Sequence, residues 1–339
     1  MTIRGASPSR AAAAIWVIVA AIVVLFGGCL FFGSVDIPAR AVIDILAGGD
    51  GGKRSWEVIV VGARLPMACT ALISGAALAV SGLLMQTTFD NPLAGPSILG
   101  VSTGSSLGVA VVMLALGGSV GAVGHYFSVL LGAVAGAMAV LLVLLLFSRF
   151  IRSSVMLLIV GIMVGYLASS AVSLLNFFST QEGVHSFVIW GLGSFSGVNL
   201  ERLPVFTAVT LAVLLLSFLM VKPLDALLLG ERYAANLGVD IRATRNRLLL
   251  LSGVLTAAVT AFCGPIGFIG LIVPHVARMA VNTSRHIFLL PATALTGSAV
   301  ALLCSLVSVM PGSWGVIPVN AITPIIGVPV ILYIILKRK

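Results

Sequence analysis

Long apolar runs alternate with short polar stretches along almost the whole chain. Most of them approach the ~20 residues that a helix needs to cross a bilayer, and they lack the alternation of barrel strands. We therefore predict about ten transmembrane helices, near residues 12–33, 58–85, 97–116, 122–148, 154–178, 202–221, 245–267, 270–283, 286–309 and 316–336. The eighth segment is short for a span and is interrupted by Pro274.

The composition agrees with this pattern. Of the 339 residues, 60% are hydrophobic and 9% are charged, and the mean hydropathy is +1.20. Soluble domains carry about 25% charged residues, so this chain has too little polar surface to cover a water-soluble globule. The predicted fold class is an all-α polytopic membrane protein, with residues 1–339 forming a single transmembrane domain.

The net charge of +9 comes from basic residues in loops and does not indicate a nucleic-acid partner. Loops rich in Lys and Arg are typical of the cytoplasmic side. With the N-terminus inside, the inside loops hold Arg149, Arg152, Lys222, Arg232, Arg242, Arg245, Arg247, Arg278 or Arg285, Lys337, Arg338 and Lys339. The outside loops hold Arg40, Lys53, Arg54 and Arg64. We therefore expect both termini to be cytoplasmic in a multi-pass protein of the lipid bilayer.

An irregular stretch lies between the second and third segments. The apolar run from Met67 to Met85 ends in a polar turn over 86–95, which contains Asp90, Asn91 and Pro92. Residues of these types stop helices and set turns. Irregular backbone cannot face lipid, because its N–H and C=O groups would lack partners. The turn is therefore expected at the membrane surface or inside the protein.

A second interrupted stretch, CGPIGFIGLIVPHVAR, covers residues 263–278. Paired interrupted spans in the two halves of a chain indicate an internal repeat with a transport pathway between them. The candidate pathway, gate and broken-helix residues are Asn91, Pro92, Gly100, Ser102, Gly104, Gly264, Gly267, Gly270, Pro274 and His275. His275 could serve a proton relay, but no acidic residue lies near it in the sequence, which favours a structural or interface histidine.

The loop at about 222–247 contains a short amphipathic segment. Residues 227–237 are apolar on one side, with Glu231 and Arg232 on the other, and Gly230 and Gly238 bracket the segment. A short helix of this kind between two spans favours docking to a partner protein. A helix that lies on lipid headgroups would show the same pattern.

Glycines recur at a spacing of four residues in several segments. They are Gly100, Gly104 and Gly108, then Gly132 and Gly136, and then Gly161 and Gly165. In lipid, helices associate by close backbone approach, which small residues permit. This spacing predicts a tightly packed bundle.

Other chemistry finds little support in the sequence. The four cysteines lie in or beside apolar runs without a CxxC motif, which predicts small buried side chains and no disulfide or metal site. The stretch from Gly48 to Lys53 fails as a Walker A motif, because Ala47 and Arg54 occupy the positions of the first glycine and the Ser or Thr. No HExxH motif is present. We predict no enzymatic activity and no cofactor, and we expect His286 to be peripheral.

From about Val58 to its end, the chain carries an ordered series of motifs. They are Arg64-Leu65-Pro66, Gly75 to Gly82, Gln86, Asn91 to Ala94, Leu99 to Ser102 with Gly104, Trp190-Gly191, Leu229-Gly230-Glu231, Leu237-Gly238-Val239, Gly264 to Arg278 and Ile317-Pro318-Val319. This series resembles the iron-chelate and cobalamin permeases, which are the membrane subunits of type II ABC importers.

The resemblance implies a type II importer permease fold with ten helices per subunit. It also implies a homodimer around a central pathway in the inner membrane, two cytoplasmic ATPase subunits and an extracytoplasmic substrate-binding protein. The residues expected to couple to the ATPase are Leu229, Gly230, Glu231, Ala234, Leu237, Gly238 and Val239. Arg64 is the residue expected to dock the binding protein. The chain would be a transport subunit, with ATP hydrolysis carried by its partner.

Two positions depart from the family pattern. Met67 stands where the family often has a second arginine, and Val316 stands where it often has an acidic residue. Docking of the binding protein is therefore expected to rest less on charge, with Arg40, Lys53 or Arg54 as possible substitutes.

The motifs do not separate the substrates of this family. We favour an iron chelate (a siderophore or haem), with cobalamin as the alternative. A secondary transporter driven by an ion gradient is a more distant alternative. Such transporters place ionisable residues at mid-membrane, whereas the spans of this chain are nearly free of Asp, Glu and Lys.

Overall fold

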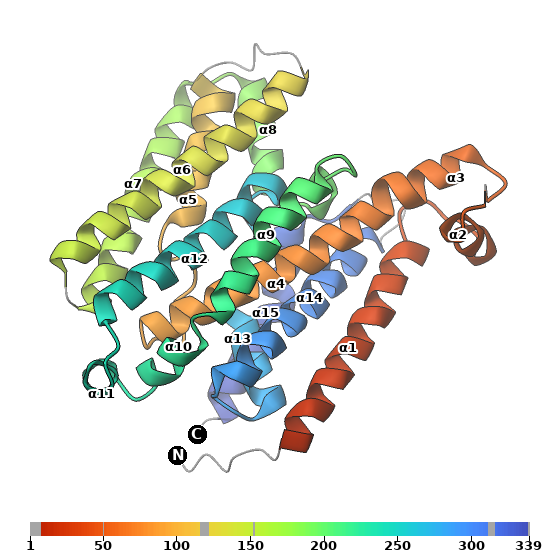
Figure 1. Cartoon of the computed structure of the whole chain (residues 1–339). Helices are drawn as coiled ribbons and strands as arrows, with labels where there is room; N and C mark the ends of the chain where they lie inside the picture. The colour runs from red at the N-terminus through yellow and green to blue at the C-terminus, as the bar shows by residue number, and fades with distance from the viewer. Residues whose placement is uncertain (1–7, 50, 116–121, 152, 311–315, 338–339) are drawn as a thin grey trace.

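The computed structural model describes residues 8–49, 51–115, 122–151, 153–310 and 316–337, which form a bundle of helices (Figure 1). The longer helices are α1 (Pro8–Phe31), α4 (Leu65–Thr88), α6 (Ala122–Phe150), α7 (Ser154–Phe178), α9 (Leu203–Phe218), α12 (Ile241–Cys263), α14 (His286–Val309) and α15 (Val319–Lys337). The shorter helices are α2 (Ala39–Leu46), α3 (Arg54–Ile59), α5 (Val101–Ala110), α8 (Gln181–Gly191), α10 (Val221–Leu227), α11 (Glu231–Asn236) and α13 (Ile269–Val281). The remaining turns are η1 (Val60–Arg64) and η2 (Val111–Ala115), both π-helical, and the 3-10 turn η3 (Phe195–Gly197).

Each of the ten predicted segments coincides with a helix of the structure. Among the described residues, six helical runs are long and apolar enough to cross a membrane. Helices α9 and α10, which meet at a bend of 54°, pass the same test together and make a seventh if the bent pair is counted as one span. Shorter apolar helices over 101–115, 269–281 and 319–330 account for the other three segments. The chain is therefore a multi-pass, all-helical membrane protein.

At the two glycine-rich breaks the helix boundaries differ from the prediction by four residues. The segment predicted from residue 97 becomes helical only at Val101, because residues 90–100 form turns. The segment predicted to reach residue 267 ends at Cys263. It ends there because Gly264 adopts a positive φ of 75° and Pro265 has no N–H to continue the helix.

Helix α4 is the central helix of the bundle and packs against α9, α12, α13 and α14 (Figure 1). Its small residues allow this close packing. A Cβ on Gly75 would lie 2.2 Å from the carbonyl oxygen of Gly297 in α14, and one on Gly82 would lie 1.7 Å from that of Gly270 in α13. Because helices in lipid associate by close backbone approach, these glycines place α4 at the centre.

The glycine spacing predicts tight packing, and the contacts of α5 confirm it. A Cβ on Gly108 would lie 1.9 Å from the carbonyl oxygen of Gly132 in α6, and one on Gly104 would lie 2.6 Å from that of Gly136. A Cβ on Gly100 would lie 2.9 Å from a glycine Cα of α7. Helix α5 is therefore held against α6 and α7 by direct backbone contact.

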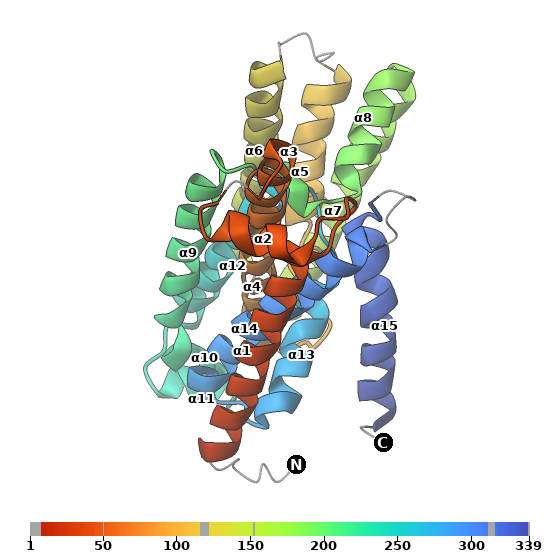
Figure 2. The same ribbon diagram turned by 90° about the vertical axis from the view of Figure 1, so that its right-hand side faces the viewer.

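Helix α1 begins, and α15 ends, at the end of the bundle that carries α10 and α11 (Figure 2). Helices α2 and α3 lie at the opposite end, beyond the N-terminal end of α4 (Figure 1). The two terminal helices therefore have their free ends on one side, as an even number of spans requires. Of the basic residues used to predict orientation, Arg152, Arg338 and Lys339 lie outside the described residues.

Candidate transport pathway and coupling site

The two interrupted stretches line one cavity of about 270 Å³. Ser97 comes from the turns that follow the first stretch, Ser102 comes from the first turn of α5, and the loop over 265–268 comes from the second stretch. Asn320, at the start of α15, completes the lining. None of these lining residues is charged; each is either polar or apolar. The two breaks in the helical bundle therefore meet at an uncharged cavity.

Backbone geometry explains why the chain is irregular on both sides of this cavity. Gly100 and Gly264 have φ values of 79° and 75°, which residues with a Cβ rarely adopt. Phe268 also has a positive φ, of 67°, which is uncommon outside glycine. In the first turn, the Asn91 side chain accepts a hydrogen bond from the Leu93 N–H at 2.9 Å, an arrangement that stabilises a turn locally.

Asn320 joins three segments that are far apart in the sequence. Its Oδ1 accepts a hydrogen bond from the Gly267 N–H at 3.0 Å, and its Nδ2 donates to the carbonyls of Pro265 at 2.6 Å and Gly191 at 3.2 Å. The amide therefore satisfies backbone groups exposed by the break before α13 and by the end of α8. Sequence reasoning missed this residue, although a lone amide at the start of an apolar segment is a signal that could have pointed to it.

A histidine joins the two interrupted stretches at a second place. His275 Nε2 lies 2.9 Å from the carbonyl oxygen of Pro92, so a protonated Nε2 donates to the first turn. One helical turn away, Gln86 Nε2 donates to the carbonyl of Leu271 at 2.9 Å. Pro92 and His275, both predicted from sequence, are therefore in contact, and the histidine joins two segments of the same chain.

The other candidate residues shape the breaks and the helix contacts. Ser102 and Gly267 line the cavity, whereas Gly100 and Gly104 pack α5 against its neighbours. A Cβ on Gly264 would lie 2.5 Å from the carbonyl oxygen of Trp190. Pro274 is buried inside α13, and Gly270 supports the contact of α13 with α4 described above. A role in the pathway or gate stays a prediction for each of them.

The predicted coupling segment forms α11, which is separated from α10 by Gly230 and followed by Gly238. These glycines have φ values of 94° and 85°, so each permits a turn that most residues would not. Leu229 and Leu237 are 60% and 67% exposed, whereas Ala234 is buried. The Val239 N–H donates to the Ala234 carbonyl at 3.1 Å. The segment therefore presents apolar side chains to its surroundings at one end of the bundle.

Hydrogen bonds from two other helices hold Glu231, and with it this segment, against the bundle. Its Oε1 accepts hydrogen bonds from Arg245 Nη2 in α12 at 3.0 Å and from the Ser154 hydroxyl at the start of α7 at 2.6 Å. The Arg245 side chain is 6% exposed and also donates to the Ile151 carbonyl at 3.3 Å. Glu231 was predicted to couple to a partner, and in this structure its carboxylate holds α11 to α7 and α12.

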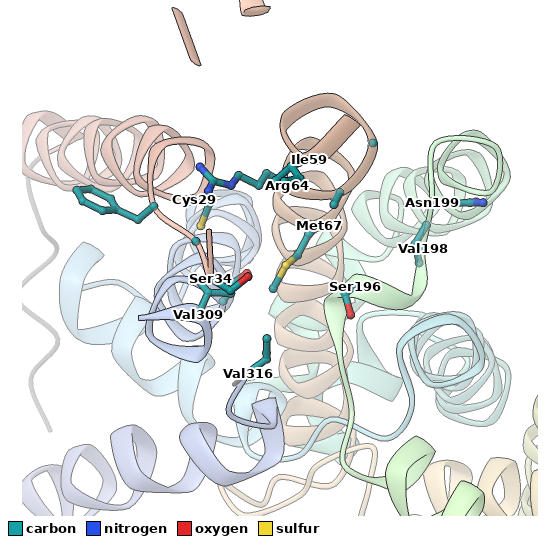
Figure 3. Close-up of a pocket in the computed structure, with 15 residues that line it drawn as sticks. Cys29, Ser34, Ile59, Arg64, Met67, Ser196, Val198, Asn199, Val309 and Val316 are labelled. Carbon is teal, nitrogen blue, oxygen red and sulfur yellow. The ribbon is translucent and has the colours of Figure 1, made fainter. Parts of the chain in front are cut away.

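Arg64 and both positions that depart from the family pattern lie around a second cavity. This cavity, of about 250 Å³, lies at the α2 end of the bundle, and Arg64, Met67 and Val316 all contribute to its lining (Figure 3). Ser196 and Asn199, in the segment after α8, contribute polar groups. The three positions of the resemblance that concern docking are therefore neighbours in space.

The Arg64 side chain is buried in spite of lining this cavity. It is 7% exposed, and its Nη1 donates to the carbonyls of Leu30 and Phe31, each at 2.9 Å. Its Nη2 donates to the Val35 carbonyl. The guanidinium therefore satisfies carbonyls at the end of α1, which have no partner within that helix. Docking of a binding protein by Arg64 stays a prediction.

His286 is fully buried, so the expectation of a peripheral histidine is wrong. It is the first residue of α14 and is covered by α10, where Asp225 Oδ1 lies 2.8 Å from the ring Nδ1. Its position next to a loop in the sequence gave no sign of this burial, because the covering helix is about 60 residues away along the chain.

Comparison with known proteins agrees with the motifs. Residues 19–337 match the FecCD transport family. The vitamin B12 import system permease protein BtuC of Salmonella arizonae is 35% identical over 293 residues, which cover 86% of this chain and 87% of that protein. The corresponding protein of Salmonella typhi is 36% identical, with coverages of 86% and 88%.

The fold is also similar to that of a solved structure. This structure is described as an inward-facing conformation of an ABC transporter proposed to be of the metal-chelate type. The TM-score is 0.83 at 31% identity, with 95% of this chain and 98% of the other covered. The fold is therefore that of a type II ABC transporter permease, as predicted. The chain is a permease subunit of an ABC importer, whose ATPase is a separate subunit, and it belongs to the FecCD transport family.

Proposed function

We propose that this permease carries cobalamin or a closely related corrinoid across the membrane. The observation that supports cobalamin is the 35–36% identity, over 86% of the chain, to permeases named for vitamin B12 import. The sequence motifs did not separate the substrates, and we first favoured an iron chelate. These relatives support the alternative, cobalamin, better. The cavity between the two broken segments has no charged lining residue, so it would contact a substrate through apolar groups and hydrogen bonds.

An iron chelate, either a siderophore or haem, is the second candidate substrate. It is supported by the similarity to the transporter proposed to be of the metal-chelate type, at 31% identity. Because one fold can carry different substrates, the choice between the two rests on a direct comparison of ligands.

The proposed assembly contains two copies of this chain, two ATPase subunits and a substrate-binding protein. The ATPase subunits would dock on α11, because Leu229, Tyr233 and Leu237 expose apolar surface there. The binding protein would dock at the opposite end, near α2 and the cavity lined by Arg64. In this orientation the α11 end and both termini are cytoplasmic, and the membrane is the inner membrane.

The mechanism proposed for this assembly needs no chemistry from the chain itself. The permease would alternate between a state open to the binding protein and a state open to the cytoplasm, and the ATPase would select between them by binding one state better. The cavity between the two broken stretches would form part of the route. The His275–Pro92 hydrogen bond joins the two broken stretches, and Asn320 ties α15 to the second one. A change at one stretch would therefore move the other.

Reconstitution in proteoliposomes tests this proposal. The chain is combined with its ATPase and binding protein, and ATP hydrolysis and uptake are measured with cyanocobalamin, a ferric siderophore and haem in turn. Stimulation by cyanocobalamin alone is expected. Stimulation by an iron chelate alone would replace cobalamin with the second candidate. A chain that never recruits an ATPase would overturn the coupling role of α11.

A further inference from the structure

A buried hydrogen-bonded connection links the coupling loop to the centre of the bundle. Asp225 lies in α10, four residues before Leu229. Its Oδ1 accepts two hydrogen bonds from His286, one from the backbone N–H and one from ring Nδ1, each at 2.8 Å. The His286 side chain is fully buried, and the Asp225 side chain is 35% exposed. The carboxylate therefore faces the interior of the bundle on one side and its surroundings on the other.

The second ring nitrogen of His286 faces α4. Its Nε2 lies 3.2 Å from the Thr87 hydroxyl, which is one residue before the end of that helix. A neutral imidazole donates from one nitrogen and accepts at the other. With Nδ1 donating to Asp225, Nε2 accepts from the Thr87 hydroxyl. The ring thus spans the gap between α10 and α4 at the start of α14.

Capping of α14 explains only part of this arrangement. An acceptor for the first N–H of a helix, with a negative charge near that end, stabilises the helix, and the Asp225–backbone bond alone would supply both. The imidazole and the Thr87 hydroxyl are not required for a cap. They add a connection from the loop that precedes α11 to the last turn of the central helix.

The connection continues into the first interrupted stretch. Thr87 is followed by the turn that contains Asn91 and Pro92, and the Pro92 carbonyl lies 2.9 Å from His275 Nε2 in α13. Next to Thr87, Gln86 donates to the Leu271 carbonyl of α13. A displacement of α10 would therefore reach α4 and α13, which border the break before the cavity.

We propose that Asp225, His286 and Thr87 are positioning residues that transmit movement of the coupling loop to the inner end of α4 and the adjoining turn. This inference rests on the proposed function. None of the three side chains lies among the residues that line the cavity between the broken stretches. Their effect is therefore on the coupling between ATP hydrolysis and transport, and not on the affinity for substrate.

The test compares two neighbouring threonines of α4. Thr87→Val removes the hydroxyl that faces His286, whereas Thr88→Val removes a hydroxyl that bonds to the Leu84 carbonyl of its own helix at 2.6 Å. The number of ATP molecules hydrolysed per substrate molecule imported is measured in proteoliposomes. The substrate is cyanocobalamin or the ferric siderophore, whichever stimulates the wild-type assembly. For T87V we expect this number to rise by about fivefold, the lower end of coupling between sites, while T88V and T87S resemble the wild type.

A second pair of variants separates the two sides of the ring. In H286N the amide nitrogen takes the place of Nδ1 and keeps the Asp225 bond, while the contact with Thr87 is lost. H286Q places its amide near Nε2 and loses the ring bond to Asp225. Both variants are expected to raise the number of ATP molecules hydrolysed per substrate molecule imported. The T87V/H286N double variant is expected to raise it no further than H286N alone, because both changes remove the same hydrogen bond.

The possible outcomes distinguish this inference from the proposed function. If the wild-type assembly shows no substrate-stimulated hydrolysis, the proposed function fails. If the wild type is coupled and T87V and H286N lower hydrolysis and uptake in equal proportion, the residues are merely structural and the inference is overturned. Equal behaviour of T87V and T88V would overturn it as well.

Discussion

Arg64 shows how one side chain can carry either a structural or a docking role. Its guanidinium donates to the carbonyls of Leu30, Phe31 and Val35. Removal of a donor from buried carbonyls costs about 1–3 kcal/mol. Arg64→Ala is therefore expected to lower the thermal midpoint of the detergent-solubilised protein, whereas Arg54→Ala, at an exposed position of α3, is expected to leave it unchanged.

Binding measurements with Arg64→Ala separate the two roles. An unchanged thermal midpoint, together with a salt-dependent loss of affinity for the binding protein, would contradict the structural role and support docking by charge. A loss of stability with unchanged affinity would leave docking to other residues around the cavity at the α2 end.

Glu231 is expected to control the order of α11. Glu231→Gln keeps the shape of the side chain but removes the charge that faces Arg245, and a partly exposed ion pair contributes about 1 kcal/mol at most. Hydrogen–deuterium exchange over 231–237 is therefore expected to rise by about fivefold, with weaker coupling to the ATPase. Arg232→Gln, at an exposed position of the same helix, serves as the control. Equal exchange in both variants would contradict the anchoring role of Glu231.

At the scale of helices, close packing of α5 against α6 depends on residues without a Cβ. In Gly108→Ala the new Cβ would lie 1.9 Å from the Gly132 carbonyl oxygen, so the two backbones must separate. Overpacking of this kind typically costs about 1–3 kcal/mol, and we expect a lower thermal midpoint. Gly27→Ala in α1, where a Cβ meets nothing within 4 Å, is expected to be neutral or slightly stabilising. Equal midpoints for the two variants would contradict this packing.

Most helices could be predicted from sequence because most apolar runs are long and end near glycine, proline or a charged residue. The segments predicted at 154–178 and 286–309 coincide with α7 and α14. The bend between α9 and α10 was missed. Pro223 lies in the first turn of α10 and cannot donate to a preceding turn, which favours a new helix there. The direction that α10 takes after the bend depends on its packing against α4 and α14.

The site could be predicted only in part, for a physical reason. Interrupted stretches leave a local signal, so the residues around Gly100 and Gly264 were found. Asn320 and the Asp225–His286 pair act between helices that are distant in sequence. Their roles appear only when tertiary packing places a backbone carbonyl or a second side chain within hydrogen-bonding distance.

At the scale of the whole molecule, the cavity in one chain is small for the proposed cargo. Ligand pockets for drug-sized molecules have volumes of about 300–1,000 Å³, and this cavity has about 270 Å³. A corrinoid or a ferric siderophore is at least drug-sized. The substrate would therefore need additional space, from the second copy of the chain or from separation of the two broken stretches. Both possibilities make the cavity one wall of a larger route.

A bulky side chain in this wall is expected to block the route. Ser102→Trp fills the cavity from the N-terminal end of α5, more than 100 residues from α11 along the chain. Because the surface proposed to dock the ATPase is unchanged, we expect assembly and basal ATP hydrolysis to persist while substrate uptake is lost. Leu142→Trp, on an exposed face of α6, controls for insertion of tryptophan into the membrane. Normal uptake by S102W would place the route elsewhere, and loss of assembly in S102W alone would show that this cavity serves the fold.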